Sequence, residues 1–246
     1  MRSGYKSFII SALLISLGSG ATAGDIVWAR DGDIDSLDPH RATSTLSRQV
    51  WYQIYDSLLE FGDDGSVGPN LAESWDVSDD GTEITFNLHD DIVCHDGSPF
   101  NADDVIWTAD RALFGDNPSL TKASWGNISS VDKIDDLTVK FTLETPFGAL
   151  VPFMADQFTS MLCDSNADAA DFGTGSAIGT GPWKLASWTK GSEIVLESNA
   201  DYVNRGRPVD NPGAPKADRL VVRTMPEGQT RVAGLRTGEL NVIVPP

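Results

Sequence analysis

The chain has 246 residues, and its 36 acidic and 18 basic side chains give a formal charge of −18 at pH 7. A surface of this charge repels nucleic acid and anionic membranes. A hydrophobic content of 40% excludes a disordered chain, and the length suffices for one or two domains.

The chain begins with a predicted signal peptide. A basic region precedes a mostly apolar run at residues 8–17 and the small-residue cleavage pattern Ala21-Thr22-Ala23. The apolar run is well short of the ~20 residues that cross a bilayer. We therefore expect residues 1–23 to be removed and the mature protein to be exported.

The first elements of the mature chain are a strand and a helix. Residues 24–40 open as a strand, with Ile26 and Trp28 on one face. Residues 44–61 carry apolar side chains at a spacing of four, which predicts an amphipathic helix with Ser47 as its N-cap.

The middle of the chain alternates strands and a helix. Residues 82–92 and 135–147 alternate apolar and polar side chains, as half-buried strands do. Asn101 is expected to cap a helix over residues 102–115, which Gly115 ends. The apolar face of the strand at residues 82–92 consists of Ile84, Phe86 and Leu88. The apolar face of the strand at residues 135–147 consists of Leu137, Val139, Phe141 and Leu143.

Three further strands are predicted at residues 192–199, 217–225 and 238–246, with a short helix closed by Gly238 between the last two. Interspersed strands and helices predict a mixed α/β protein.

A glycine-rich stretch at residues 171–188 resembles a phosphate-binding loop, but its spacing departs from GxGxxG by one residue. Gly181 is followed by Pro182 and a strand-like segment, whereas a phosphate loop leads into a helix. The glycines are therefore interpreted as permitting tight turns and close backbone approach.

Other motifs give no strong indication of an active site or a metal site. Ser187 and Lys190 match SxxK, which would indicate a secreted serine hydrolase of the penicillin-recognising type, but that motif requires a helix. Asp31, Asp33 and Asp35 lack the glycine and glutamate of a calcium loop. The histidines form no metal-binding pair, so we expect no metal site. No set of nucleophile, base and orienting acid can be assigned, so we also expect no cofactor and no catalysis.

The two cysteines, Cys94 and Cys163, either form a disulfide or remain as free thiols. Export to an oxidising compartment makes the bond chemically possible.

Several blocks, in order, resemble the periplasmic solute-binding proteins of peptide-, nickel- and opine-type ABC importers, the oligopeptide- and dipeptide-binding group. The blocks are SLDPH at 36–40, YDSLLEF at 55–61, the stretch from PNLAESW to HDGSPFNADDV at 69–105, VDKIDDLTVKFTLETPF at 131–147, GTGPWKLASWTKGSEIVLESNADY at 179–202 and TRVAGLRTGELNVI at 230–243.

The resemblance implies a type II periplasmic-binding-protein-like α/β fold. Residues 24–61 and 176–246 would form a first lobe with a mixed sheet, and residues 62–175 a small accessory α+β domain. Family members continue into a second lobe, which this chain does not contain, so we expect a fragment that ends at the hinge.

The resemblance also implies a periplasmic receptor that closes on a peptide or related small solute and delivers it to ABC permease subunits. The residues that could contact the ligand are Thr43, Ser44, Thr45, Trp125, Gln157, Gly179 and Thr180. Helix capping is the alternative role for residues 43–45, and a core position is the alternative for Trp125. A standalone interaction domain remains the other non-catalytic interpretation.

Overall fold

The computed structural model describes residues 24–206 and 209–246. The predicted signal peptide lies outside these residues. No helix in the described ranges is long and apolar enough to cross a membrane.

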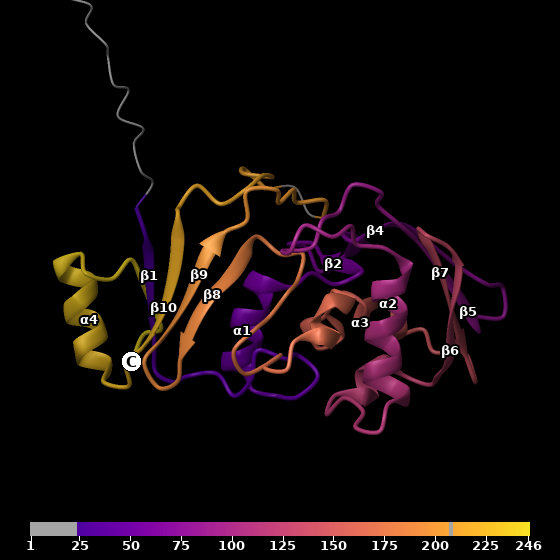
Figure 1. The fold of residues 1–246 in the computed structure, drawn as a ribbon, viewed down its shortest axis with the longest axis horizontal. Helices are drawn as coiled ribbons and strands as arrows, with labels where there is room; N and C mark the ends of the chain where they lie inside the picture. Colours follow the sequence, from indigo (N-terminus) through magenta and orange to yellow (C-terminus); the bar gives the residue numbers. More distant parts are fainter. Residues whose placement is uncertain (1–23, 207–208) are drawn as a thin grey trace, which may run out of the picture.

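A five-stranded mixed sheet forms one end of the molecule (Figure 1). The strand β1 (Ile26–Arg30) pairs in parallel with β10 (Arg219–Thr224) and with β11 (Val242–Ile243). Antiparallel β9 (Glu193–Ser198) and β8 (Trp183–Thr189) complete the order β11-β1-β10-β9-β8. Helix α4 (Gly228–Thr237) connects β10 to β11 and ends at Gly238, as predicted.

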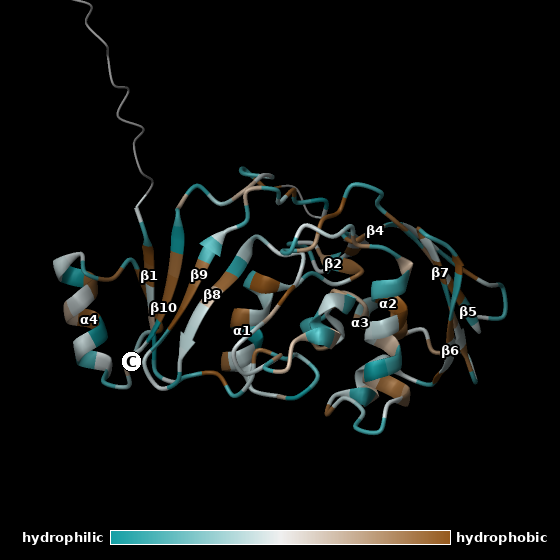
Figure 2. Ribbon diagram, in the orientation of Figure 1, coloured by the Kyte–Doolittle hydropathy of each residue, from teal (hydrophilic) through white to brown (hydrophobic). Residues whose placement is uncertain are grey.

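Helix α1 (Thr45–Ile54) buries Val50, Trp51 and Ile54 in the core of this sheet. Figure 2 shows the hydrophobic colouring along β1, β10 and β9 that accompanies this burial. The mixed sheet and its helices confirm the predicted α/β class.

Two details of α1 correct the sequence prediction. The N-cap is Ser44, whose side chain accepts the Ser47 N–H at 3.1 Å, whereas Ser47 is a buried residue inside the helix. The helix also ends at Ile54 instead of continuing to residue 61. Tyr55 is extended, and β2 (Leu59–Phe61) pairs with β3 (Val67–Pro69). Leu58 and Leu59 are buried in a second core, which a continued helix would not reach.

The second core lies under a four-stranded antiparallel sheet of order β4-β5-β7-β6. Its strands are β4 (Ala72–Val77), β5 (Glu83–Leu88), β6 (Ile128–Asp135) and β7 (Thr138–Leu143). The predicted faces of β5 and β7 are buried except for Leu137, which is half-buried and precedes β7. The rings of Phe86 and Phe141 are in edge-to-face contact, with their centroids 5.2 Å apart.

Helix α2 (Ala102–Ala109) packs against this sheet, and Asn101 caps it as predicted. Asp104 completes a capping box by accepting the Asn101 N–H at 2.8 Å. A π-helical turn over Asp110–Phe114 prolongs α2 (Figure 1), and the short helix α3 (Leu150–Phe153) contacts β2 and the turn at Lys122–Trp125.

The glycine-rich stretch returns the chain to the first sheet. The Gly181 N–H donates to the Ile54 carbonyl at 2.9 Å, and a Cβ atom on Gly179 would lie 2.2 Å from the same oxygen. Trp183 then starts β8. Close backbone approach therefore explains these glycines, as the sequence indicated.

Candidate functional site

Three segments meet beside the beginning of α1. The Leu120 N–H donates to the His40 carbonyl at 3.1 Å, and the Arg41 side chain donates to the Pro118 carbonyl at 2.9 Å. Thr121 donates to the Phe158 carbonyl at 3.4 Å. We call this place the three-segment junction; it comprises residues 38–45, 118–125 and 156–160.

The predicted contacts in the first segment differ from one another in exposure. Thr43 and Thr45 are exposed. Ser44 is half-buried, and its hydroxyl donates to the Ser47 Oγ at 2.9 Å while its oxygen caps α1. Ser44 therefore has a structural role, and Thr43 and Thr45 are the side chains open to solvent.

Trp125 lies beneath the junction. Its side chain is fully buried, its ring meets the His40 ring edge-on at 5.8 Å between centroids, and its indole N–H has no hydrogen-bond partner in the described chain. The structure thus places Trp125 in the floor of the junction, as a core aromatic.

A buried polar cluster supports the same floor. The Arg111 guanidinium holds both oxygens of the Asp38 carboxylate and donates to His40 Nδ1 at 3.0 Å. Burial lowers the pKa of His40 to about 3, so this imidazole is neutral at pH 7. Sequence reasoning missed the cluster because Arg111 lies 73 residues after Asp38, within a helical pattern.

Gln157 faces a cavity of about 770 Å³ between α1, β2 and the loop that follows β9. Acidic, amide and aromatic side chains dominate its wall: Trp28, Gln49, Tyr52, Gln53, Tyr55, Asp56, Glu60, Phe61, Asn70, Gln157, Tyr202, Asn204 and Asn211. Such a lining offers both stacking surfaces and hydrogen bonds to a polar ligand.

Asp56 is a half-buried acid of this wall. Burial raises its pKa to about 6, and hydrogen bonds from Thr180 and Asn70 oppose the shift. Thr180 itself is buried and reaches the cavity only through Asp56. Gly179 is buried too and donates to His95 Nδ1 at 3.2 Å, so the structure brings neither residue to the three-segment junction.

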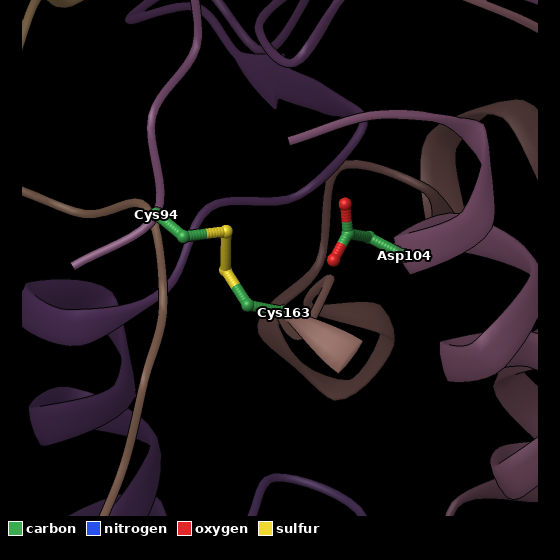
Figure 3. A group of neighbouring side chains, drawn as sticks. All are labelled: Cys94, Asp104 and Cys163. Carbon is green, nitrogen blue, oxygen red and sulfur yellow. A yellow bond between two sulfur atoms is a disulfide. The ribbon is translucent and has the colours of Figure 1, made fainter. Parts of the chain in front are cut away.

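Cys94 and Cys163 are joined by a disulfide, with their Cα atoms 6.3 Å apart (Figure 3). The two sulfurs and a carboxylate oxygen of Asp104 lie within 4.8 Å of one another. Because both sulfurs are bonded to each other, they offer no thiolate to a metal ion. Burial raises the pKa of Asp104 to about 6, and its oxygens accept backbone N–H groups of Asp164 and Asn101.

The serine-hydrolase interpretation finds no support in the geometry. Ser187 is an exposed residue of β8, not of a helix, and Lys190 follows in the turn with its Nζ 4.9 Å from the Trp188 ring centroid. An SxxK pair on a strand does not place the lysine over the serine as a helical turn does.

The comparisons with known proteins agree with one another. The family model of bacterial extracellular solute-binding proteins, family 5, matches residues 66–246. A glutathione-binding protein of Pectobacterium atrosepticum is 34% identical over 226 residues, covering 91% of this chain and 42% of its own.

Two solved structures match the fold. The periplasmic binding protein DppA of Helicobacter pylori with peptide STSA has a TM-score of 0.80 and 31% identity, over 91% of this chain and 47% of its own. A dipeptide-binding protein of Pseudoalteromonas sp. SM9913 in complex with Met-Leu has a TM-score of 0.80 and 26% identity, and the match covers 89% of this chain and 47% of that protein. The chain spans less than half the length of these relatives.

Proposed function

Because the chain belongs to the bacterial extracellular solute-binding proteins of family 5, we propose that it forms the first lobe of a solute receptor for an ABC importer. The receptor is exported to the periplasm after cleavage of residues 1–23, binds a peptide or a related small solute, and delivers it to the permease. It performs no covalent chemistry. The observation that carries the proposal is the family match, together with relatives that bind glutathione, STSA and Met-Leu.

The proposed solute-facing surface is the three-segment junction, where residues 38–45 of the lobe meet residues 118–125 and 156–160 of the accessory domain. Its first segment lies between β1 and α1 in the chain, and it exposes Thr43 and Thr45 at the first turn of α1. Residues 24–61 and 176–246 form the lobe, and residues 62–175 form the accessory domain. A second lobe closes over the junction and buries the solute by hinge motion. Gly179 and Thr180 are buried outside the junction, and the buried Gln157 of the junction faces the cavity that Asp56 also lines.

The test is calorimetric binding of the purified full-length gene product to a panel of dipeptides, tripeptides, glutathione and opines. We expect saturable binding of at least one peptide-like member, and loss of its uptake in cells that lack the gene. A receptor that binds no panel member, in cells whose peptide uptake is unchanged by the deletion, would contradict the proposal.

A further inference from the structure

Two guanidinium groups share one carboxylate at the three-segment junction. Arg111 takes both oxygens of Asp38, whose side chain is only 4% exposed. Arg41 is left with a long contact of 3.9 Å between its Nε and Asp38 Oδ2. The carboxylate therefore neutralises Arg111, and it compensates Arg41 only weakly.

The charges within this cluster do not cancel. Arg41 and Arg111 each carry one positive charge at neutral pH, and Asp38 carries the single negative one. His40 adds none, because burial keeps it neutral. Burial lowers the pKa of Arg41, and the nearby charge of Arg111 lowers it further, against the opposing effect of Asp38. One positive charge remains, on a chain whose formal charge is −18.

Arg41 also has hydrogen-bonding capacity to spare. A guanidinium presents five N–H donors, and one of those of Arg41 is directed at the Pro118 carbonyl at 2.9 Å. Its side chain is 26% exposed, so it combines an anchored position with access to solvent. It precedes exposed Thr43 by two residues, and the first turn of α1 contains no acidic side chain to oppose an anion.

We propose that Arg41 binds a carboxylate of the solute at the three-segment junction. This inference rests on the proposed function and adds a substrate class, because it requires an anionic solute such as a peptide with a free C-terminus. The planar fork of arginine matches a carboxylate through two parallel hydrogen bonds. The Asp38–Arg111 pair fixes the loop that presents Arg41.

The experiment compares the wild-type full-length protein with Arg41→Gln and Arg41→Lys. The tightest-binding peptide of a di- to tetrapeptide panel is titrated as the free acid and as its C-terminal amide. Arg41→Gln should weaken binding of the acid at least about tenfold, equivalent to about 1.4 kcal/mol, and leave binding of the amide unchanged, because the lost hydrogen bonds are those to the charged carboxylate. The affinity of Arg41→Lys for the acid should lie between the affinities of the wild type and of Arg41→Gln. Arg236→Gln, an exposed arginine on α4, is the matched control and should change neither.

A second measurement separates this inference from the proposed function. The midpoint of thermal unfolding is measured in succinate and in chloride, at the same ionic strength, for the wild type and for Arg41→Gln. If no peptide binds but succinate stabilises the wild type and not Arg41→Gln, the anion site stands and the peptide-receptor proposal fails. If peptides bind with equal affinity as acid and amide, or if Arg41→Gln weakens both equally, the role of Arg41 is wrong while the receptor proposal stands. If the wild type and Arg41→Gln have the same peptide affinities and the same unfolding midpoints in succinate, the proposed role of Arg41 is also wrong.

Discussion

The Thr180 hydroxyl donates a hydrogen bond of 2.9 Å to the Asp56 carboxylate across 124 residues of sequence. Asp56 follows α1, and Thr180 lies in the glycine-rich return to β8. The bond thus joins the two separate chain segments of the first sheet. Because burial raises the pKa of Asp56 to about 6, this donor helps to keep the carboxylate ionised at neutral pH.

Thr180→Val should therefore destabilise the protein by about 1–3 kcal/mol, because it leaves a buried acceptor short of a donor. Urea unfolding at pH 7.5 measures the change. Thr189→Val, at an exposed position at the end of β8, is the matched control and should have little effect. Identical midpoints for Thr180→Val and wild type would mean that water replaces the hydroxyl.

The elements that could be predicted are those whose signal is local. The alternation in β5 and β7 and the cap at Asn101 depend on neighbouring residues, and the structure confirms them. The position at which α1 ends is determined instead by packing against residues that are distant in sequence. Leu58 continues the helical spacing, but it is buried in the second core, and this long-range packing overrides the local pattern.

The candidate site was only partly predictable for the same reason. Thr43 and Thr45 were identified through the resemblance, and the structure leaves them exposed. Asp56 was missed, although an acid within the apolar run YDSLL is a signal of a partnered buried carboxylate. The Asp38–Arg111 pair has no local signature, because its two members are 73 residues apart in sequence.

The disulfide should be present in the exported protein. Denatured, unreduced protein should then show no free thiol in a thiol titration, and two after reduction. The bond joins residues 69 apart in sequence, so its loss in the double variant Cys94→Ala/Cys163→Ala should cost about 4 kcal/mol on the chain-entropy model. Two titratable thiols in the unreduced protein would contradict this prediction.

His40 should make the protein less stable in acid. It is neutral in the fold, with a pKa of about 3, whereas the unfolded chain takes up a proton near pH 6.5. The contribution of neutral His40 to the free energy of unfolding is present above pH 6.5 and decreases as the pH falls toward 3. Relative to His40→Gln, the wild type should lose about 2 kcal/mol between pH 6.5 and pH 5.

Urea unfolding of the wild type and of His40→Gln at several pH values between 7.5 and 5 measures this difference in stability. Asp56 and Asp104, whose raised pKa values favour the folded state on acidification, are common to both proteins and cancel in the difference. The charged groups that act on His40 are Asp38, Arg41 and Arg111, and all remain in His40→Gln. Parallel stability curves from pH 7.5 to 5 would show that His40 titrates normally in the fold.

The mature protein should begin at Gly24, because the cleavage pattern Ala21-Thr22-Ala23 follows a short apolar run. N-terminal sequencing of the exported protein tests this. Ala23→Arg should block processing and leave the leader attached, because signal cleavage requires a small residue at that position. An N-terminus far from Gly24 in the wild type would show that another site is used.

Gly179→Ala should be among the most damaging small substitutions in the chain. The added Cβ atom would lie 2.2 Å from the Ile54 carbonyl oxygen and 2.6 Å from the Tyr55 ring, where neither backbone nor a buried ring can move freely. Overpacking of this kind costs about 1–3 kcal/mol, and contact with backbone places the expected loss at the upper end.

The matched control is Gly148→Ala. Nothing lies within 4 Å of a Cβ atom at Gly148, and its φ is not positive, so the substitution should be neutral or stabilise by up to about 1 kcal/mol. Thermal and urea unfolding of both variants measures the contrast. If the glycine-rich stretch were instead a loop that needs freedom to hold a ligand, Gly179→Ala would keep the wild-type midpoint and lose only binding. A midpoint lowered by several degrees, with the Gly148→Ala midpoint unchanged, would identify close packing against the end of α1 as the reason for glycine at position 179.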